Sequence, residues 1–248
     1  MYKKGLYTVM RNERIAPKTW VMVLGGDTQY LTAPGQFVNL AVDGKYLRRP
    51  ISLCDYDDHT ITLLYDVVGE GTVIMSRAEI GDTFDVLTGL GNGFQIEKDR
   101  KRPLLLGGGI GVAPLLRLAR DLRDAGQNPI VALGFNTAAD VVLAEDFEAL
   151  GLETYISTVD GTRGVRGFVT DIVKGLREET YDYYYACGPT PMLRAVAQTV
   201  PCDGQLSLDE RMGCGFGACM CCSIETTRGS KRVCKEGPVF RKEELIWK

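Results

Sequence analysis

Leu104-Leu-Leu-Gly-Gly-Gly-Ile-Gly-Val-Ala-Pro114 decides the fold of the middle of the chain. An apolar run, a glycine string and a helical pattern over 113–125 predict a strand, a phosphate-binding loop and a helix. A pyrophosphate there would meet bare backbone N–H groups and the positive end of the helix dipole, so the candidate nucleotide-binding residues are Gly107, Gly109 and Gly111. A glycine turn needed only for close packing is the alternative.

This loop is not a standard dinucleotide fingerprint. Pro114 replaces its third glycine, which suits the first turn of a helix. The acidic residue expected about 20 residues later is missing, because the next strand ends in Gly134-Phe135-Asn136. Another candidate for the nucleotide site, Ala186-Cys187-Gly188-Pro189, closes a later strand, and ligands bind at the carboxyl ends of strands in such sheets.

Working outward from the loop, the pattern divides the chain into three parts. Buried strands expected at 104–106, 130–134, 154–158 and 181–186 alternate with helices at 113–125 and 190–199, which predicts a parallel sheet. Before the charged segment 97–102, strands at 19–24, 37–42, 60–68 and 83–86 are separated by glycine and aspartate turns, which predicts a small antiparallel barrel. The expected fold class is therefore a β barrel plus an α/β domain, with a small C-terminal domain. The expected boundaries are 1–100, 101–203 and 204–248.

The C-terminal part carries four cysteines in the order C-x4-C-x2-C-x11-C: Cys214, Cys219, Cys222 and Cys234. This is the plant-type spacing for a [2Fe-2S] cluster, which requires three ligands in one tight loop and a fourth on a returning strand. Zinc is the competing metal, but zinc sites usually pair their ligands in two short knuckles. Cys221 is the one rival ligand, and we interpret it as a bystander because using it would spoil the spacing.

Composition excludes several function classes. The 248 residues carry a net charge of −3 and no long basic run, so nucleic acid is not an expected partner. No apolar stretch approaches the ~20 residues of a membrane span. The cysteines follow no signal peptide, which predicts a reducing, cytoplasmic setting. The single histidine, His59, lies in a turn-like string, so a histidine-based hydrolase or metal centre is not expected, and we assign no catalytic residue.

Two strings in the barrel part are suited to a flavin. Arg49-Pro50-Ile51-Ser52 is expected on a strand, where the arginine can pair with a pyrophosphate and Ser52 can hydrogen-bond the flavin ring. Val68-Gly69-Glu70-Gly71-Thr72 is expected to begin a short helix that offers N–H groups to the same phosphates. Each string alone is better explained by structure than by function: Arg49 would then form a surface ion pair, and Cys187 would be a small buried residue.

Taken in order, these motifs resemble the ferredoxin-reductase-like flavoprotein family. With the cysteines added, nearly the whole chain resembles the electron-transfer subunits of two-subunit, NAD-dependent dihydroorotate dehydrogenases. The most specific segments are 90–94 (L-G-N-G-F), 209–215 (D-E-R-M-G-C-G) and 234–240 (C-K-E-G-P-V-F). The resemblance implies that the barrel holds FAD through Arg49, Pro50, Ile51, Ser52, Gly71 and Thr72, that the sheet domain receives NAD, and that the cluster faces a separate FMN-containing subunit.

The implied function is to pass electrons from a partner dihydroorotate dehydrogenase through [2Fe-2S] and FAD to NAD+, in pyrimidine biosynthesis and within a heterotetramer. No side chain suggests a general base, so oxidation of dihydroorotate is assigned to the partner. Flavin and iron-sulfur subunits of hydrogenases, sulfite reductases or transhydrogenase-type complexes remain alternatives, as does a zinc-bearing binding module. Arg163 and Arg166 offer positive charge to a 2′-phosphate, so NADP is an alternative to NAD as the nucleotide. Phe216 and Met220, beside the ligands, either belong to a partner interface or pack on the protein's own barrel.

Overall fold

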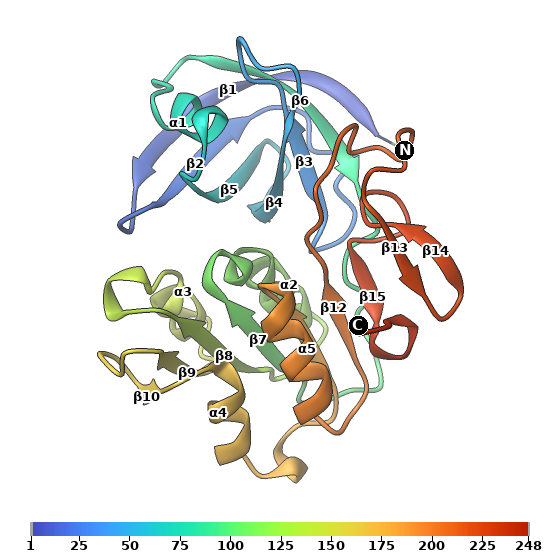
Figure 1. Ribbon diagram of the computed structural model, residues 1–248. Helices are drawn as coiled ribbons and strands as arrows, with labels where there is room; N and C mark the ends of the chain where they lie inside the picture. Colours follow the sequence, from blue (N-terminus) through green and yellow to red (C-terminus); the bar gives the residue numbers. More distant parts are fainter. Residues whose placement is uncertain (1, 248) are drawn as a thin grey trace.

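The computed structural model describes residues 2–247 and has three connected parts, with the barrel at the top of Figure 1, the α/β sheet below it and a small hairpin module at one side. Six strands close the antiparallel barrel in the order β1-β2-β5-β4-β3-β6. Their bounds are β1 Lys3–Arg14, β2 Thr19–Gly25, β3 Phe37–Leu40, β4 Arg49–Tyr56, β5 Thr60–Asp66 and β6 Thr83–Leu90. The short helix α1, Glu70–Ser76, follows β5.

A seven-stranded sheet forms the second part, in the order β10-β9-β8-β7-β11-β12-β15. All of its neighbours run parallel except β15, which runs antiparallel to β12. The strands are β7 Leu104–Gly108, β8 Ile130–Phe135, β9 Glu153–Thr158, β10 Val165–Arg166, β11 Tyr184–Cys187, β12 Gly204–Ser207 and β15 Val239–Arg241.

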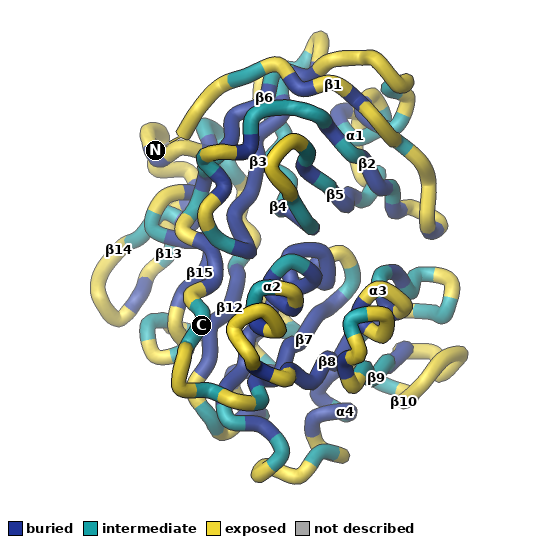
Figure 2. The backbone as a smooth tube through the Cα atoms, turned by 180° about the vertical axis from the view of Figure 1, so that it is seen from behind, coloured by how far each residue is buried: buried dark blue, intermediate teal, exposed yellow. Residues whose placement is uncertain are grey.

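Helices cover both faces of this sheet, and the side chains of its central strands alternate between two cores, the dark blue strands of Figure 2. On one face Leu105 packs with α2, Ala113–Asp124, and α3, Ala144–Ala149. On the other face Leu104 and Leu106 pack with α4, Val169–Gly175, and α5, Thr190–Thr199. Strand order reverses between β7 and β11, and ligands bind in open sheets of this kind at such a switch point.

This architecture confirms the fold class expected from the sequence. The alternating pattern correctly located the strands that became β7, β8 and β9, and the helices α2 and α5. It missed β1, α3 and α4. The segment 181–186 becomes a strand only from Tyr184, after a turn. Strands β12 and β15 come from residues that the sequence assigned to the C-terminal domain, so that segment contributes both to the sheet and to the cysteine module. The three boundaries themselves stay a prediction.

The cysteine module consists of the loop 209–222, the hairpin β13 (Ser223–Thr226) and β14 (Gly229–Arg232), and the segment up to β15. Asn92, in the L-G-N-G-F string, fastens it to the end of the barrel. The Asn92 amide donates to the carbonyls of Glu236 (3.0 Å) and Val239 (2.9 Å) and accepts from the N–H of Val239 (3.2 Å). Gly91 allows this approach, because a Cβ there would lie 2.6 Å from Pro238 Cδ.

We predict that Asn92→Ala loosens the module without unfolding the barrel. Losing three hydrogen bonds from a partly exposed side chain should cost about 1–2 kcal/mol of local stability, which is a factor of about 5–30 in local opening. Hydrogen exchange of residues 223–241 should quicken by that factor, while exchange in β2 and β5 stays unchanged. Asn128→Ala, at an exposed asparagine with no side-chain hydrogen bond in the structure, is the control. Equal exchange in both variants would contradict the clamp.

Candidate functional site

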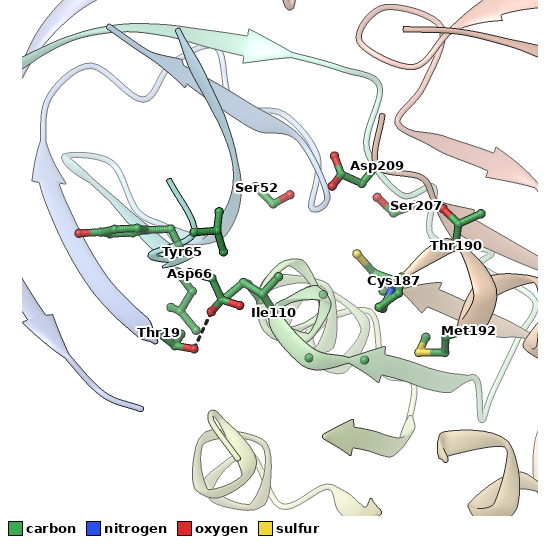
Figure 3. Close-up of a pocket in the computed structure, with 18 of the residues that line it drawn as sticks. Thr19, Ser52, Tyr65, Asp66, Ile110, Cys187, Thr190, Met192, Ser207 and Asp209 are labelled. Carbon is green, nitrogen blue, oxygen red and sulfur yellow. Dashed lines mark hydrogen bonds between the residues drawn. The ribbon is translucent and has the colours of Figure 1, made fainter. Parts of the chain in front are cut away.

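A single cleft of about 1050 Å³ separates the barrel from the sheet and reaches the start of the cysteine loop. Figure 3 shows side chains from β4, β5, β11 and β12 turned toward this space. Of the twelve cofactor-binding residues expected from the sequence, eleven line the cleft: Arg49, Pro50, Ile51, Ser52, Gly71, Thr72, Gly109, Gly111, Cys187, Gly188 and Pro189. The twelfth, Gly107, does not line it, since a Cβ there would face Val112 and Leu115 in the core.

On the barrel side, Arg49 and the start of α1 form one surface. A Cβ at Gly71 would lie 2.1 Å from Arg49 Nε, so the guanidinium lies directly on this glycine. The Arg49 side chain also donates to the carbonyl of Leu47, which fixes its direction. Thr72 closes the turn, because its hydroxyl accepts from the N–H groups of Val68 (3.0 Å) and Gly69 (3.2 Å). A cation and backbone at a helix start make a surface suited to phosphate.

On the sheet side, some glycines of the loop allow close packing and one exposes its backbone to the cleft. Gly108 and Gly111 allow close packing: a Cβ at Gly111 would lie 2.6 Å from the carbonyl of Cys187, and one at Gly108 would lie 2.2 Å from Met192 Sδ. Gly109 has φ +53° and open space where a side chain would be, so its backbone faces the cleft. The packing interpretation therefore holds for most of the string, and Gly109 is the residue whose backbone is free for a ligand.

The sequence reasoning missed several polar residues of the cleft. Asp66, at the end of β5, accepts a hydrogen bond from Thr19 Oγ1 (2.7 Å) and pairs with Lys18 (2.8 Å). Asp140, which follows β8, lines the cleft. It supplies an acidic side chain near the place where the dinucleotide fingerprint expects one and where the end of β8 has none. Ser207 is the last residue of β12, and Asp209 lies two residues further on. No motif marks Asp66, Asp140 or Ser207, and only the strand order brings them to the same edge. Asp209 opens the D-E-R-M-G-C-G string, but the sequence reasoning gave it no role in the cleft.

Cys187, Ser207 and Asp209 form a group opposite Ser52 (Figure 3). Burial raises the pKa of the Cys187 thiol to about 12, against the effect of a hydrogen bond with Ser207, so Cys187 stays a neutral thiol near pH 7. Asp209 is open to the cleft but has protein on most sides. The resulting desolvation, with Glu210 adding to it, raises the pKa of its carboxyl group. The group therefore offers weak donors and acceptors rather than a nucleophile.

The four candidate ligand cysteines fall into two pairs. Cys219 Sγ accepts from the N–H of Cys214 (3.3 Å) and also hydrogen-bonds its side chain. Cys222 Sγ accepts from the N–H of Cys234 (3.4 Å), and these two thiols also interact. Within residues 2–247 no three metal-ligating side chains gather closely enough to hold a single ion. Two pairs suit a two-iron cluster with two thiolates on each iron better than a four-cysteine zinc site.

The backbone around Cys214 favours negative charge on its sulfur. Burial opposes ionisation of Cys214, but hydrogen bonds from the N–H groups of Phe216, Cys219 and Ala218 outweigh it and lower the pKa of this thiol to about 6. Burial, together with the neighbouring Cys222, raises the pKa of Cys234 to about 12. N–H groups aimed at sulfur are what a thiolate cluster requires around it.

Cys221 lies among the candidate ligands in the sequence, but its thiol makes a different contact. Its thiol is exposed and donates to the carbonyl of Arg211 (3.4 Å), and within residues 2–247 it forms no hydrogen bond with a candidate ligand. Gly213 makes room for the neighbouring ligand instead, since a Cβ there would lie 3.1 Å from Cys219 Sγ. This arrangement agrees with Cys221 as a bystander.

Comparisons with known proteins identify the family. The chain is 42% identical over 246 residues to the dihydroorotate dehydrogenase B (NAD(+)) electron transfer subunit of Fusobacterium nucleatum, which covers 94% of this chain and 95% of the relative. The chain belongs to this family. The Bacillus caldolyticus member is 44% identical over 251 residues, covering 96% of this chain and 97% of the relative. Membership confirms the resemblance found in the sequence and implies a separate catalytic subunit.

Two further matches support the assignment. Residues 209–246, which contain all four ligand candidates, match the iron-sulfur cluster binding domain of dihydroorotate dehydrogenase B. Among solved structures, the NADH-dependent reduced ferredoxin-NADP oxidoreductase is similar with a TM-score of 0.89 and 30% identity, covering 98% of this chain and 90% of that chain. The chain is thus an electron-transfer subunit of an oxidoreductase. Across residues 2–247, every helix is too short or too polar to cross a bilayer.

We predict that Cys214 is the most reactive thiol of the metal-free protein at neutral pH. Its pKa of about 6 leaves it as a thiolate above that pH, so its alkylation rate should halve near pH 6 and level off above about pH 7. Iodoacetamide labelling read out by peptide mass measures this. Buried Cys54 and Cys187 should stay unlabelled. A Cys214 midpoint at pH 8–9, the range of an ordinary thiol, would contradict the N–H arrangement.

Proposed function

We propose that this chain links a separate, FMN-containing dihydroorotate dehydrogenase subunit to NAD+, with FAD in the cleft and a [2Fe-2S] cluster on the cysteine loop. When bound, these groups supply the needed conversion, because a flavin exchanges single electrons with a cluster and a hydride with nicotinamide. The chain's own residues bind these groups, orient them and exclude water. The single observation that carries the proposal is that one continuous cleft joins the barrel, the glycine loop and the cysteine loop.

The barrel wall fits FAD. Arg49 against Gly71 leaves a surface of guanidinium and backbone where a pyrophosphate can lie, and Pro50, Ile51 and Ser52 continue along β4 beneath the space for a flavin ring. Ser52 supplies a hydroxyl for the polar edge of the ring. We assign the FAD contacts to Arg49–Ser52, Gly71 and Thr72.

The sheet side of the same cleft fits a nicotinamide nucleotide. Gly109 exposes its backbone at the start of the helical segment, and Cys187, Gly188 and Pro189 form the opposite lip. Asp140 lies five residues after the end of β8, where its carboxylate also accepts from the hydroxyl of Thr137 (2.9 Å). It lines the cleft and favours NAD over NADP, because a carboxylate there would repel a 2′-phosphate. Arg163 and Arg166, which kept NADP open, lie outside the residues that line the cleft. We therefore assign NAD.

The cysteine loop fits the cluster and a partner surface. Cys214 with Cys219 and Cys222 with Cys234 supply two thiolates for each iron. Around them the loop presents Phe216, 37% exposed, and Met220, 55% exposed, and the Phe216 ring lies 5.6 Å from that of Tyr2. Apolar side chains at the rim of a redox site suit an interface core. We propose that the FMN-containing subunit covers this surface in a cytoplasmic heterotetramer.

Arg49→Ala should weaken FAD binding about 10- to 150-fold, since a charge-assisted contact to phosphate contributes roughly 1.5–3 kcal/mol. Fluorescence titration of flavin-free protein with FAD measures this. Arg11→Ala, which removes an exposed arginine of β1 outside the cleft, is the matched control. An unchanged FAD affinity in Arg49→Ala would show that Arg49 is a surface residue with no contact to FAD.

Replacing Cys214, Cys219, Cys222 or Cys234 by serine should bleach the iron-sulfur absorption, whereas Cys221→Ser should leave it intact. The physical reason is the pairing, which leaves Cys221 facing the Arg211 carbonyl. Iron content and visible spectra of the five variants measure the outcome. A cluster that survives in all four ligand variants, or that is lost in Cys221→Ser, would refute the ligand set.

The test of the proposed function is reconstitution. Mixing this chain with the separately purified FMN-containing subunit should produce dihydroorotate-dependent NADH formation and a complex with two copies of each chain. Neither protein alone should form NADH from dihydroorotate. NADH formation by the catalytic partner alone, or none from the reconstituted pair, would favour another reductase complex.

A further inference from the structure

One buried amide connects the barrel to a ligand of the proposed cluster. Asn39 lies on β3, is 1% exposed, and donates from Nδ2 to the carbonyl oxygen of Cys214 at 3.1 Å. Gly215 makes this contact possible, since it has φ +77° and a Cβ there would lie 2.4 Å from Asn39 Nδ2. The side chain thus reaches across the domain boundary to the first cysteine of the loop.

The same strand forms one wall of the cleft. Alternation along β3 turns Val38 and Leu40 into the barrel core and leaves Phe37 and Asn39 on the other face. Asn39 pairs directly with Pro50 and Phe37 with Ser52. Phe37 lines the cleft and also packs in the core that contains Cys222 and Cys234. The proposed flavin strand and the cysteine loop are therefore joined through one intervening strand.

Packing alone does not account for an asparagine here. Asn39 Oδ1 is buried and has no hydrogen-bond partner among the described residues, which is unfavourable. An apolar residue, like its neighbours Val38 and Leu40, would avoid that cost. The backbone of Asn39 is also fixed, because its carbonyl accepts from Arg48 (3.2 Å), and Arg48 in turn holds Asp85 (2.9 Å). The backbone of Asn39 is thus anchored, and among the described residues its side-chain amide forms one hydrogen bond, with Cys214.

We propose that Asn39 is a positioning residue for electron transfer, which fixes the cluster-ligand loop against the flavin strand. This inference rests on the proposed function and deepens it. A cysteine ligand is oriented by the groups that hold its backbone, and loss of such support typically costs 10- to 100-fold in metal affinity or activity. Transfer between two centres depends steeply on their separation, so a loosened loop should slow the step between flavin and cluster and leave hydride transfer at the flavin unchanged.

The experiment uses the full chain with FAD and cluster loaded, mixed with NADH in an anaerobic stopped-flow instrument. Asn39→Leu removes the donor, and Gly215→Ala pushes the loop away from an unchanged Asn39. Gln127→Leu is the matched control, because Gln127 is also a buried amide with an unpartnered side-chain oxygen, and its Nε2 donates to the backbone carbonyl of Glu97 (2.8 Å), outside the cleft and the cysteine loop.

In Asn39→Leu and Gly215→Ala, flavin reduction should stay within about twofold of wild type, while cluster reduction slows about 10- to 100-fold and the electron paramagnetic resonance spectrum of the reduced cluster changes. Gln127→Leu should behave as wild type. Loss of the cluster alone from Asn39→Leu would also support the proposal, since Cys214 is what Asn39 is proposed to hold.

Three results would overturn it: wild-type cluster reduction and an unchanged spectrum in both variants, the same slowing in Gln127→Leu, or loss of flavin together with cluster in Asn39→Leu. The last would make Asn39 a general support of the barrel. Failure of the proposed function is separately visible, because the wild-type protein itself would then lack the flavin or the iron-sulfur absorption.

Discussion

The pairing of β3 with β4 is the constraint on which the rest of the molecule depends. Its register places Phe37 opposite Ser52 and Asn39 opposite Pro50, so the strand that carries the proposed flavin contacts is backed directly by the strand that meets the cysteine module. The sheet domain then closes the cleft from below with Gly109 and Cys187. Asn92 holds the module from a second point. Two sites distant in sequence therefore share one rigid support.

The chemistry of both sites comes mainly from backbone and charge. N–H groups surround Cys214, and the Arg232 guanidinium, paired with Glu236, donates to the Gly217 carbonyl and holds the loop behind the sulfurs. In the cleft, the pKa of the Cys187 thiol is too high for a nucleophile. The site can bind, orient and insulate redox groups, which agrees with an electron-transfer subunit whose substrate is oxidised on another chain.

Local signals in the sequence were enough to predict the barrel, the parallel sheet and eleven of the residues that line the cleft. Arg49–Ser52, Gly71 and the cysteine spacing are local motifs whose geometry follows from short-range structure. Gly107 was included because a glycine string does not reveal which member packs inward. Asp66 and Asn39 could not be found, because they meet the site only through strand order and register. Asp209 opens the D-E-R-M-G-C-G string, but nothing local indicates that it reaches the cleft. The addition of β15 to the sheet was missed as well, since it pairs with β12 across more than 30 residues and such pairing leaves no periodic signal.

The most direct test of the central claim is an anaerobic NADH titration of the isolated chain, followed by visible and electron paramagnetic resonance spectra. One FAD and one [2Fe-2S] cluster on this support should take up about three electron equivalents per chain, with flavin bleaching and the paramagnetic signal of a reduced cluster appearing in the same molecule. NADPH should be the poorer reductant. A protein that is colourless and contains zinc, or a flavin that reduces while the cluster stays oxidised, would contradict the account.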